Sequence, residues 1–305
     1  MKGRWRRLGS LSLDTSRASW AATHAALPVA EPAGDGSWDV YVSLRDGDGR
    51  ARIGRTHLTL HPAPVLAPLE PDPVLDLGAL GTFDDAGVTS SCLVSVAERR
   101  YLYYTGWTRG VSVPFYLHVG LAISENNGPF HRLSRAPLLD RSPADPYLTA
   151  SPCVRADGDG WKMWYVSGSE WKATDSGPRH YYNIRYAEST DGVVWRRDGR
   201  TCIDYANETE HAFARPCVIR DADRFRMWYA VRGDRYRIGY AASVDGIDWT
   251  RLDDVAGLDP AGHGWDSEMV EYPWIFDDET GRWLMLYNGN GYGRSGVGLA
   301  VWDED

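Results

Sequence analysis

The sequence lacks the features that mark membrane-spanning and nucleic-acid-binding proteins. No apolar run approaches the roughly 20 residues that a membrane-spanning helix needs. Acidic residues outnumber basic ones by 42 to 33, and the net charge of -9 argues against nucleic acid or an anionic membrane as a partner, because both require a basic surface. The basic N-terminus, with Lys2, Arg4, Arg6 and Arg7, is not followed by the apolar core of a signal peptide. We therefore expect a cytoplasmic protein.

Cysteine is scarce as well. The chain has four cysteines and no pair spaced as C-x-x-C. Cys92, Cys153 and Cys217 occupy corresponding positions in short apolar segments, where a small buried side chain is a better interpretation than a disulfide or a metal ligand. The sequence therefore predicts no metal ion and no cofactor.

Phenylalanine is rare, with 6 residues against 14 Trp and 17 Tyr. Trp and Tyr combine an apolar face with a polar edge, so they suit both packing between sheets and stacking on polar ligands. The loop residues that are candidates for ligand contact are Trp107, Arg109, Trp171 and Trp265. Packing between neighbouring sheets is the alternative interpretation of these tryptophans.

The most informative feature of the chain is an internal repeat. Its clearest copy, residues 208–252, contains four short aromatic or β-branched runs separated by turn residues, which is the pattern of a four-stranded antiparallel sheet. Successive anchors at Cys92, Cys153, Cys217 and Trp274 are spaced about 60 residues apart, a period typical of propellers and arrays. An earlier copy precedes them. The sequence thus predicts an all-β fold with almost no helix: a five-bladed β-propeller of four-stranded antiparallel blades.

The copies also predict how the chain begins and ends. We expect a single domain over residues 1–305, with blades at 14–62, 84–135, 146–199, 210–254 and 267–305. The last copy ends after its third strand, whereas Trp5-Arg6-Arg7 resembles the outer-strand motif Trp195-Arg196-Arg197. The N-terminal strand 3–9 is therefore expected to pair with the C-terminal blade and to close the ring.

Acidic residues stand shortly before several predicted inner strands, at matching distances from the anchors. The set comprises Asp84, Asp85, Asp145, Glu210, Asp266 and Glu268. Any one of these acids has a simpler explanation as a loop or turn residue. Together they favour a site at the mouth of the channel, because clustered acids cost stability unless something offsets the repulsion.

Basic side chains accompany these acids. His24 and His211 enter two of the copies on the channel side, where they could bind an anion or, with Glu268, a metal, although their spacing is not a local metal motif. Arg215 lies inside a predicted inner strand, and burial there would require an anionic partner. That partner would be Glu210 or Glu268 as a structural pair, or a negatively charged ligand. The remaining expected substrate contacts are Glu271 and Asn290.

Two turns, Ser189 to Trp195 and Ser243 to Trp249, share the pattern Ser-x-Asp-Gly-x-x-Trp. Together with the blade pattern, they resemble the five-bladed propeller glycosidases of glycoside hydrolase families 43, 32, 68 and 130. The chain is more closely similar to uncharacterised bacterial glycosidase-like proteins encoded near polysaccharide or secondary-metabolite genes. Segments that carry this closer similarity include residues 81–85, 139–143, 214–217, 265–269 and 286–291.

The resemblance implies cleavage or transfer at a glycosidic bond by inward-facing carboxylates, typically an Asp from the first blade, an Asp from the second and a Glu from a later one. Asp85, or Asp84, matches the second position and Glu210 the third, with Glu268 as a substitute. His24 stands where the first Asp is expected. We therefore expect Glu210 to act as general acid and Asp85 as base or nucleophile on a sugar or glycosylated metabolite.

The absent first-blade Asp and the two histidines leave two alternatives open. One is a biosynthetic lyase, cyclase or isomerase that uses the same site for acid-base chemistry. The other is a non-catalytic sugar-binding propeller. The fold alone does not decide between them, because one scaffold can host unrelated functions.

Overall fold

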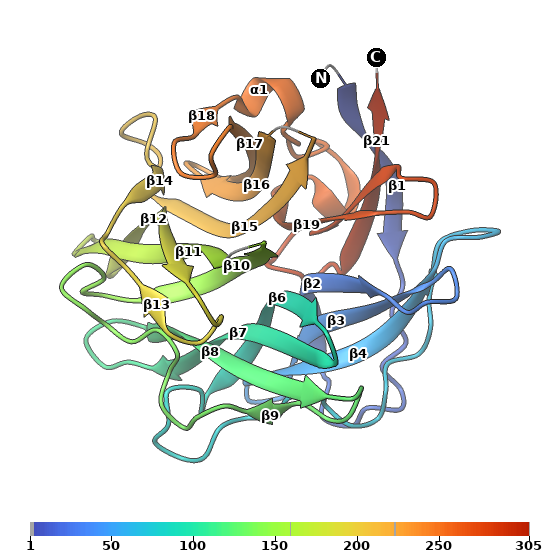
Figure 1. Ribbon diagram of the computed structural model, residues 1–305, viewed down its shortest axis with the longest axis horizontal. Coiled ribbons are helices and arrows are strands. Elements are labelled where there is room, and N and C mark those ends of the chain that lie inside the picture. The colour runs from blue at the N-terminus through green and yellow to red at the C-terminus, as the bar shows by residue number, and fades with distance from the viewer. Residues whose placement is uncertain (1–2, 159, 223, 305) are drawn as a thin grey trace.

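The computed structural model describes residues 3–158, 160–222 and 224–304 and shows an all-β fold (Figure 1). In the described residues, helix is limited to the short α1 (Asp253–Ala256) and one 3-10 turn, Gly264–Asp266. The predicted near-absence of helix is confirmed. No helix in the described part of the chain is both long and apolar enough to cross a membrane.

The strands form three hydrogen-bonded sheets. The first contains β2 (Thr23–Pro32), β3 (Trp38–Arg45), β4 (Ala51–Thr59), β5 (Val65–Leu66), β6 (Gly87–Val96), β7 (Arg99–Arg109), β8 (Phe115–Glu125) and β9 (His131–Arg132). The second contains β10 (Thr149–Asp157), β11 (Gly160–Lys172), β12 (Arg179–Ser189), β13 (Trp195–Arg196), β14 (Thr201–Ile203), β15 (Ala212–Asp221), β16 (Arg224–Arg232), β17 (Tyr236–Ser243) and β18 (Thr250–Arg251). The third contains β1 (Gly3–Leu11), β19 (Glu271–Asp277), β20 (Trp283–Asn288) and β21 (Val297–Glu304).

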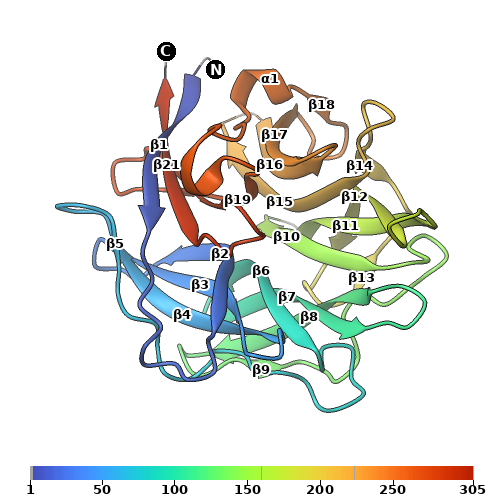
Figure 2. The same cartoon turned by 180° about the vertical axis from the view of Figure 1, so that it is seen from behind.

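Each of the two larger sheets consists of two antiparallel units joined by one parallel pair. These pairs are Ala51 with Gly87 and Tyr182 with Ala212. The first strands of the units, β2, β6, β10, β15 and β19, lie nearest the middle of the molecule in both views (Figures 1 and 2). Each contacts the next in chain order, and β19 contacts β2. Residues that are far apart in the sequence therefore meet around one axis.

The second strand of each unit is buried on both faces, which explains its run of large apolar residues. In β16, Met227, Trp228 and Tyr229 are all completely buried. Strict alternation of apolar and polar residues is unnecessary here, because neighbouring units cover both sides of the sheet. Such runs therefore mark the packing between units.

The Ser-x-Asp-Gly-x-x-Trp turns fasten neighbouring units together. At Asp245-Gly246, the glycine has a φ of 77°, which a side-chain-bearing residue rarely adopts, and its amide donates to Ser243 Oγ at 2.9 Å. Its carbonyl oxygen accepts the indole N–H of Trp164 from the preceding unit at 2.7 Å. The equivalent carbonyl of Gly192 accepts the Tyr103 hydroxyl at 2.7 Å. The turn motif thus has a structural role.

The anchor cysteines link successive inner strands. The amides of Val154, Val218 and Ile275 donate to the sulfur atoms of Cys92, Cys153 and Cys217 at 3.2 to 3.3 Å. All four cysteines are free thiols, and these three are buried. Their predicted role as small buried side chains is confirmed.

The predicted pairing of the N-terminal strand with the C-terminal unit is also confirmed. β1 runs antiparallel to β21, with Trp5 opposite Trp302 and Leu11 opposite Val297. The two termini lie side by side in Figure 1. Arg7 of β1 donates to the buried carboxylate of Asp266 at 2.7 Å, so a side chain also connects this strand to the loop before β19.

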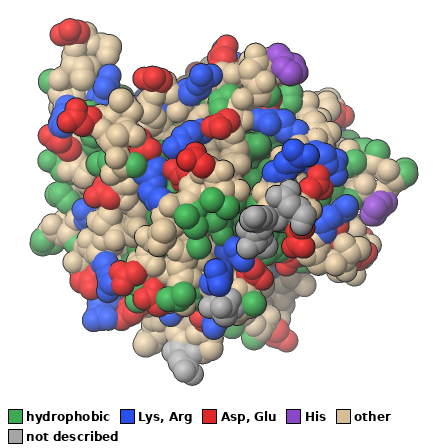
Figure 3. All heavy atoms as spheres, turned by 90° about the horizontal axis from the view of Figure 1, so that it is seen from above, with side chains coloured by type: hydrophobic (Ala, Val, Ile, Leu, Met, Phe, Trp, Pro, Cys, Tyr) green, Lys and Arg blue, Asp and Glu red, His purple; other side chains and the backbone are tan. Residues whose placement is uncertain are grey.

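Charge is mixed on the surface of the protein. On the side seen in Figure 3, basic and acidic side chains are interspersed over α1 and the two terminal strands. Arg6 of β1, for example, pairs with Asp303 of β21 at 2.6 Å. The net negative charge is thus not gathered into one acidic face on this side.

The Arg7 contact makes a stability prediction. The Arg7→Ala variant should lower the free energy of unfolding by about 2 kcal/mol, because it leaves the Asp266 carboxylate buried without its cation. The loss is smaller than for a fully buried ion pair, because the Arg7 side chain is 31% exposed. Urea-induced unfolding measures this difference. Arg6→Ala is the matched control, because its pair with Asp303 is exposed at both ends and should matter little. Equal effects of the two variants would contradict the assignment.

Candidate functional site

Three of the acids at matched positions take part in a repeated structural contact. Asp84, Asp145 and Asp266 are at most 2% exposed. Each accepts a hydrogen bond from a tyrosine of the second strand and pairs with an arginine on the outer side of the same unit. The triads are Asp84 with Tyr104 and Arg132, Asp145 with Tyr165 and Arg197, and Asp266 with Tyr287 and Arg7. These acids are engaged within the sheets.

The fourth unit has the same arrangement at a different sequence position. Asp253 accepts a hydrogen bond from Tyr229 at 2.6 Å and pairs with Arg251 at 2.5 Å. The triads of Asp84 and Asp266 favour a structural role for both residues, and their expected contact with substrate stays a prediction. A buried carboxylate that is bonded to tyrosine and arginine is less accessible to a ligand than an unpaired one.

Glu210, the expected general acid, belongs to the same ionic network. Arg251 contacts both of its carboxylate oxygens at 2.7 and 2.9 Å, and the Ala206 amide donates to it at 2.9 Å. Burial would raise the pKa of Glu210, but the hydrogen bonds from Arg251 and Ala206 outweigh burial and hold the pKa below its ordinary value. A general acid must carry a proton, so this geometry favours a structural role for Glu210.

The other two expected catalytic acids lie in loops and are not paired with an arginine among the described residues. Asp85 is half-buried, and its carboxylate accepts the Gly81 amide at 2.9 Å. Glu268 is exposed, and its amide is held by Asn290 Oδ1 at 2.8 Å. Asn290 thus supports the loop before β19. In the described part of the chain, no hydrogen bond or ion pair joins Asp85, Glu210 and Glu268 to one another.

Arg215 is completely buried, and its expected anionic partner is replaced by backbone oxygens. Its guanidinium donates to the carbonyl oxygens of Ser90 and Pro28 at 3.0 and 2.8 Å, and lies 5.4 Å from the centre of the Trp274 ring. Neither Glu210 nor Glu268 pairs with it in the described structure. Burial lowers the pKa of Arg215 to about 10, so it stays charged at neutral pH. Arg215 ties the fourth unit to the first two, and its expected contact with a substrate stays a prediction.

Trp274 packs beside Arg215 on the neighbouring inner strand. Its ring packs against four separate hydrophobic clusters, and its indole N–H donates to the Ala30 carbonyl at 3.0 Å. Trp274 and Arg215 therefore occupy part of the middle of the molecule.

The expected aromatic contacts are mainly packing contacts. Trp265 lies 5.3 Å from the ring of Tyr287, and Trp171 lies edge-on to Phe115 at 5.3 Å. The Trp107 indole covers Gly87, where an added Cβ atom would come within 2.0 Å of the ring nitrogen. Arg109 is exposed and donates to the Asp48 carbonyl at 2.6 Å. Stacking of these residues on a ligand stays a prediction.

A kink in the inner strands turns particular side chains toward the axis. The residues that share this position have a positive φ and precede a proline: Leu27, Ser151, Arg215 and Tyr272, with φ between 45° and 58°. The strand registers shift at each of these points, as expected for β-bulges. Left-handed backbone in residues other than glycine costs energy and gathers at functional sites. The bulges at the start of the inner strands therefore indicate the region of the candidate site.

Glu271, which opens β19 beside one of these bulges, is the most unusual acid of the protein. It is completely buried, and no arginine, lysine or histidine pairs with its carboxyl group among the described residues; only the Tyr272 hydroxyl acts on it as a hydrogen-bond donor. Burial raises its pKa well above the ordinary value, and the nearby Tyr272 hydroxyl and Arg232 charge oppose this only in part. Burial therefore favours the protonated form of the Glu271 carboxyl group.

Aromatic and basic side chains surround Glu271. Arg232, at the end of β16, donates to the Tyr292 hydroxyl at 3.0 Å and lies 5.4 Å from the ring centre of Tyr236. Tyr236 and Tyr292 meet edge to face at 6.2 Å. Of this group only Glu271 was predicted from the sequence. Tyr272 precedes Pro273 as Arg215 precedes Pro216, and this shared pattern was the available signal for it.

Two histidines lie close to Arg232. The rings of His180 and His211 are 5.8 Å apart, and one nitrogen of each, Nε2 and Nδ1 respectively, lacks a partner among the described residues. Burial lowers the pKa of His180 to about 4, helped by His211 and Arg232. Burial and Arg232 also lower the pKa of His211. Both rings are therefore neutral at pH 7 and can accept as well as donate a proton.

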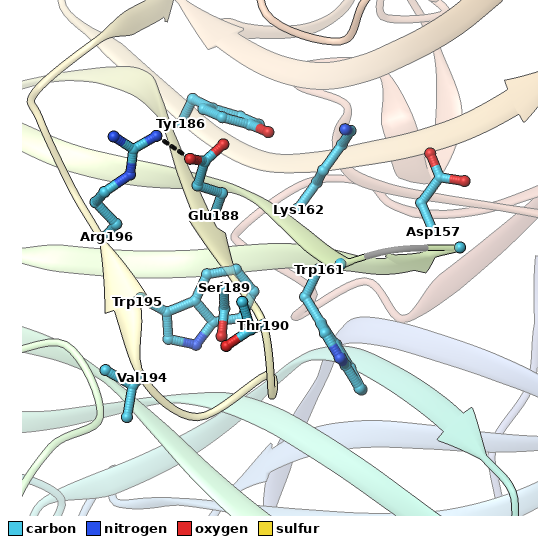
Figure 4. Close-up of a pocket in the computed structure, with 12 residues that line it drawn as sticks. Asp157, Trp161, Lys162, Tyr186, Glu188, Ser189, Thr190, Val194, Trp195 and Arg196 are labelled. Atoms are coloured by element: carbon cyan, nitrogen blue, oxygen red, sulfur yellow. Dashed lines mark hydrogen bonds and ion pairs between the residues drawn. The ribbon is translucent and has the colours of Figure 1, made fainter.

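Two of the hollows on the surface of the described residues bear on the site. The larger, about 750 Å³, is lined by Trp161, Tyr186, Glu188, Trp195 and Arg196 among others, and contains none of the predicted site residues (Figure 4). The smaller, about 330 Å³, is lined in part by His24 and Arg294. No group of three or more His, Cys, Asp or Glu within residues 3–158, 160–222 and 224–304 is arranged to hold a metal ion.

Comparison with solved structures places this fold among the glycoside-hydrolase-like β-propellers. The chain is similar to a glycoside hydrolase with 16% identity and a TM-score of 0.76, covering 98% of this chain and 92% of that one. A thermostable family-43 glycoside hydrolase gives 16% identity and a TM-score of 0.66, with 95% and 92% covered. Sucrose-6-phosphate hydrolase from Lactobacillus gasseri gives 12% and 0.63, with 94% and 60% covered. At these identities the likeness shows the fold alone.

Sequence comparison gives the family. No family model matches the chain. It is 42% identical over 298 residues to the uncharacterized proteins MT1551 and Rv1502 of two Mycobacterium tuberculosis strains, covering 97% of this chain and 98% of each relative. The chain belongs to the same family as these mycobacterial proteins.

The buried carboxyl group of Glu271 predicts a pH-dependent stability difference. The folded protein holds this proton at pH values where the unfolded chain has lost it, so the Glu271 contribution falls as pH rises above the ordinary Glu pKa. Glu271→Gln should therefore gain stability relative to wild type between pH 4 and pH 7. Paired urea titrations measure the gap, with the exposed Glu98→Gln as control. A gap that is constant or shrinks with rising pH would contradict the assignment.

Proposed function

We propose that the chain forms a single closed five-bladed propeller over residues 1–305, with the blade limits expected from the sequence. The circle of contacts from β2 through β19 and back to β2 supports this arrangement, as does the pairing of β1 with β21. Under this proposal, the starts of the inner strands converge on one mouth, where ligands bind in such folds. The cytoplasmic location expected from the sequence stays a prediction.

We further propose that the protein is a carbohydrate-active enzyme of glycoside hydrolase type. The observation that carries this proposal is the Glu271 carboxyl group, which is buried beside the Tyr272 hydroxyl with no cation paired to it among the described residues, and whose pKa is raised by burial. Protonation of a leaving glycosidic oxygen requires a carboxylic acid whose pKa has been raised in this way. The solved neighbours, several of which are glycoside hydrolases, support a sugar or glycosylated metabolite as the substrate.

In this mechanism Glu271 donates the proton, in place of Glu210. Glycoside hydrolysis also needs a second, ionised carboxylate that activates water or attacks the sugar. Asp85 and Glu268 stay the candidates for that role, because neither is occupied by an arginine in the described structure. Tyr272 and Arg232 would orient the substrate near the proton donor.

A second candidate function rests on the two neutral histidines. His180 and His211 each have an unpartnered ring nitrogen close to Arg232, which also neighbours Glu271. A protonated carboxyl group and a neutral imidazole form an acid-base pair that needs no second carboxylate. This arrangement supports a lyase, cyclase or isomerase that rearranges its substrate. A non-catalytic sugar-binding propeller is the third possibility.

The Glu271→Gln variant tests the assignment. Turnover of a panel of aryl glycosides should fall by about 10² to 10⁴-fold, the usual contribution of a general acid, while ligand binding stays unchanged. Glu98→Gln is the surface control and Glu210→Gln tests the residue first expected. Wild-type turnover in Glu271→Gln would refute the proposed role.

The products separate the three functions. Release of a free sugar with addition of water supports hydrolysis. Loss of a group that leaves a double bond supports a lyase, and a rearranged product with no group lost supports an isomerase or cyclase. Binding without turnover in the wild-type protein supports the sugar-binding alternative. Mass spectrometry of the reaction mixture distinguishes the products, and calorimetry identifies binding without turnover.

A further inference from the structure

The smaller hollow lies where β1 ends, β2 begins and the loop between β20 and β21 folds back. Its polar lining comes from Ser12, Thr15, Thr23, His24, Arg294 and Ser295. No acidic residue is among the described residues that line it. Its volume of about 330 Å³ falls at the lower end of the range for small-ligand sites. A basic, hydroxyl-rich hollow without an acid suits a negatively charged group.

Arg294 gives the lining of this hollow its charge, and Arg45, which is not part of the lining, lies beside it. Arg294 is exposed and lines it directly, while Arg45 lies opposite Thr23 in the ladder between β2 and β3. Neither arginine forms an ion pair with an acidic residue in the described part of the chain. Most other arginines around the sheets are engaged, as Arg50 and Arg52 are with Asp46. These two cations are therefore available to a ligand.

His24 adds a directional contact. Its Nδ1 lies 2.9 Å from Thr23 Oγ1, and its backbone is left-handed with a φ of 64°. Burial lowers the pKa of His24 to about 4, helped by the charges of Arg45 and Arg294. The ring is therefore neutral, and its Nε2 has no protein partner within the described residues. A neutral imidazole beside two arginines can donate a hydrogen bond to an oxyanion.

The loop that carries Arg294 is held in place against β2. Gly293 has a φ of 88°, and a Cβ atom there would meet the Ala26 Cβ at 2.7 Å. Its carbonyl oxygen accepts the Ala25 amide at 2.9 Å. Only glycine permits both this backbone conformation and this close approach. The position of Arg294 over the hollow is thus fixed by the fold.

The hollow adjoins the region of Glu271. Asn288 lies directly opposite Glu271 in the ladder between β19 and β20. Its side-chain amide donates to the carbonyl oxygens of Ala25 and Gly296, two residues that line the hollow. Tyr292, next to Gly293 in the loop, reaches back to Arg232. Asn288 thus connects the hollow to the strand that carries Glu271.

We propose that this hollow binds an oxyanion, either a phosphate or a carboxylate, carried by the substrate. Resting on the proposed function, this inference makes the substrate an anionic glycoside whose charged group is held by Arg45, Arg294 and His24 while its glycosidic oxygen lies near Glu271. Arginine binds both oxyanions through paired, charge-assisted hydrogen bonds, so the structure assigns their shared chemistry.

Calorimetric titration tests the proposal with four probes: inorganic phosphate, glucose 6-phosphate, glucuronate and glucose. At least one charged probe should bind at least tenfold more tightly than glucose, and the stronger of the phosphate and carboxylate probes identifies the oxyanion. Arg294→Gln and Arg45→Gln should each weaken that binding by about tenfold, the loss expected for a charge-assisted contact. Arg4→Gln, which removes an exposed charge from the opposite end of β1, is the matched control and should bind as wild type does.

Failure of this proposal is distinguishable from failure of the proposed function. Equal binding of glucose and the charged probes, no binding of any charged probe, or full binding by both arginine variants would overturn the oxyanion site. Glu271→Gln should retain oxyanion binding, because that residue does not line the hollow. Oxyanion binding without turnover of any glycoside would leave the hollow intact and remove the glycosidase assignment.

Discussion

The structure depends on one repeated contact, in which a buried carboxylate joins a tyrosine of the middle strand to an arginine on the outer side of the same unit. Asp84, Asp145, Asp253 and Asp266 each supply the carboxylate. The contact fixes the order of strands within a unit, because arginine and tyrosine must reach the same oxygens. In the last unit, formed by β19 to β21, the arginine is Arg7. The N-terminal strand β1 therefore serves as the outer strand of this unit.

This contact also explains why most acids at the mouth are not available for chemistry. A carboxylate that accepts hydrogen bonds from arginine and tyrosine is stabilised in its charged form and stays ionised. Glu271 is the opposite case, since burial without a partner stabilises the protonated form. Arg215 and Trp274 fill the axis below it. The account of function therefore rests on the contrast between paired and unpaired acids within one ring of strands.

Local patterns in the sequence were sufficient for much of the fold. The aromatic runs, the turns and the likeness of Trp5-Arg6-Arg7 to Trp195-Arg196-Arg197 predicted the strand units and the pairing of β1 with β21. The same likeness contained the structural triad, because Arg7 and Arg197 make equivalent contacts to Asp266 and Asp145. The acids at matching positions indicated a repeated role, and three of them form the same structural contact with tyrosine and arginine. The site could not be assigned in this way, because the sequence does not show which acids pair with arginine and tyrosine and which do not.

The most direct test of this account is the protonation state of Glu271 at neutral pH. Infrared difference spectroscopy between wild type and Glu271→Gln detects the carbonyl stretch of a protonated carboxyl group. The account predicts that band at pH 7 in the wild-type protein and its loss in the variant. A spectrum that shows an ionised carboxylate at pH 7 would contradict the role of Glu271 as proton donor and the mechanism built on it.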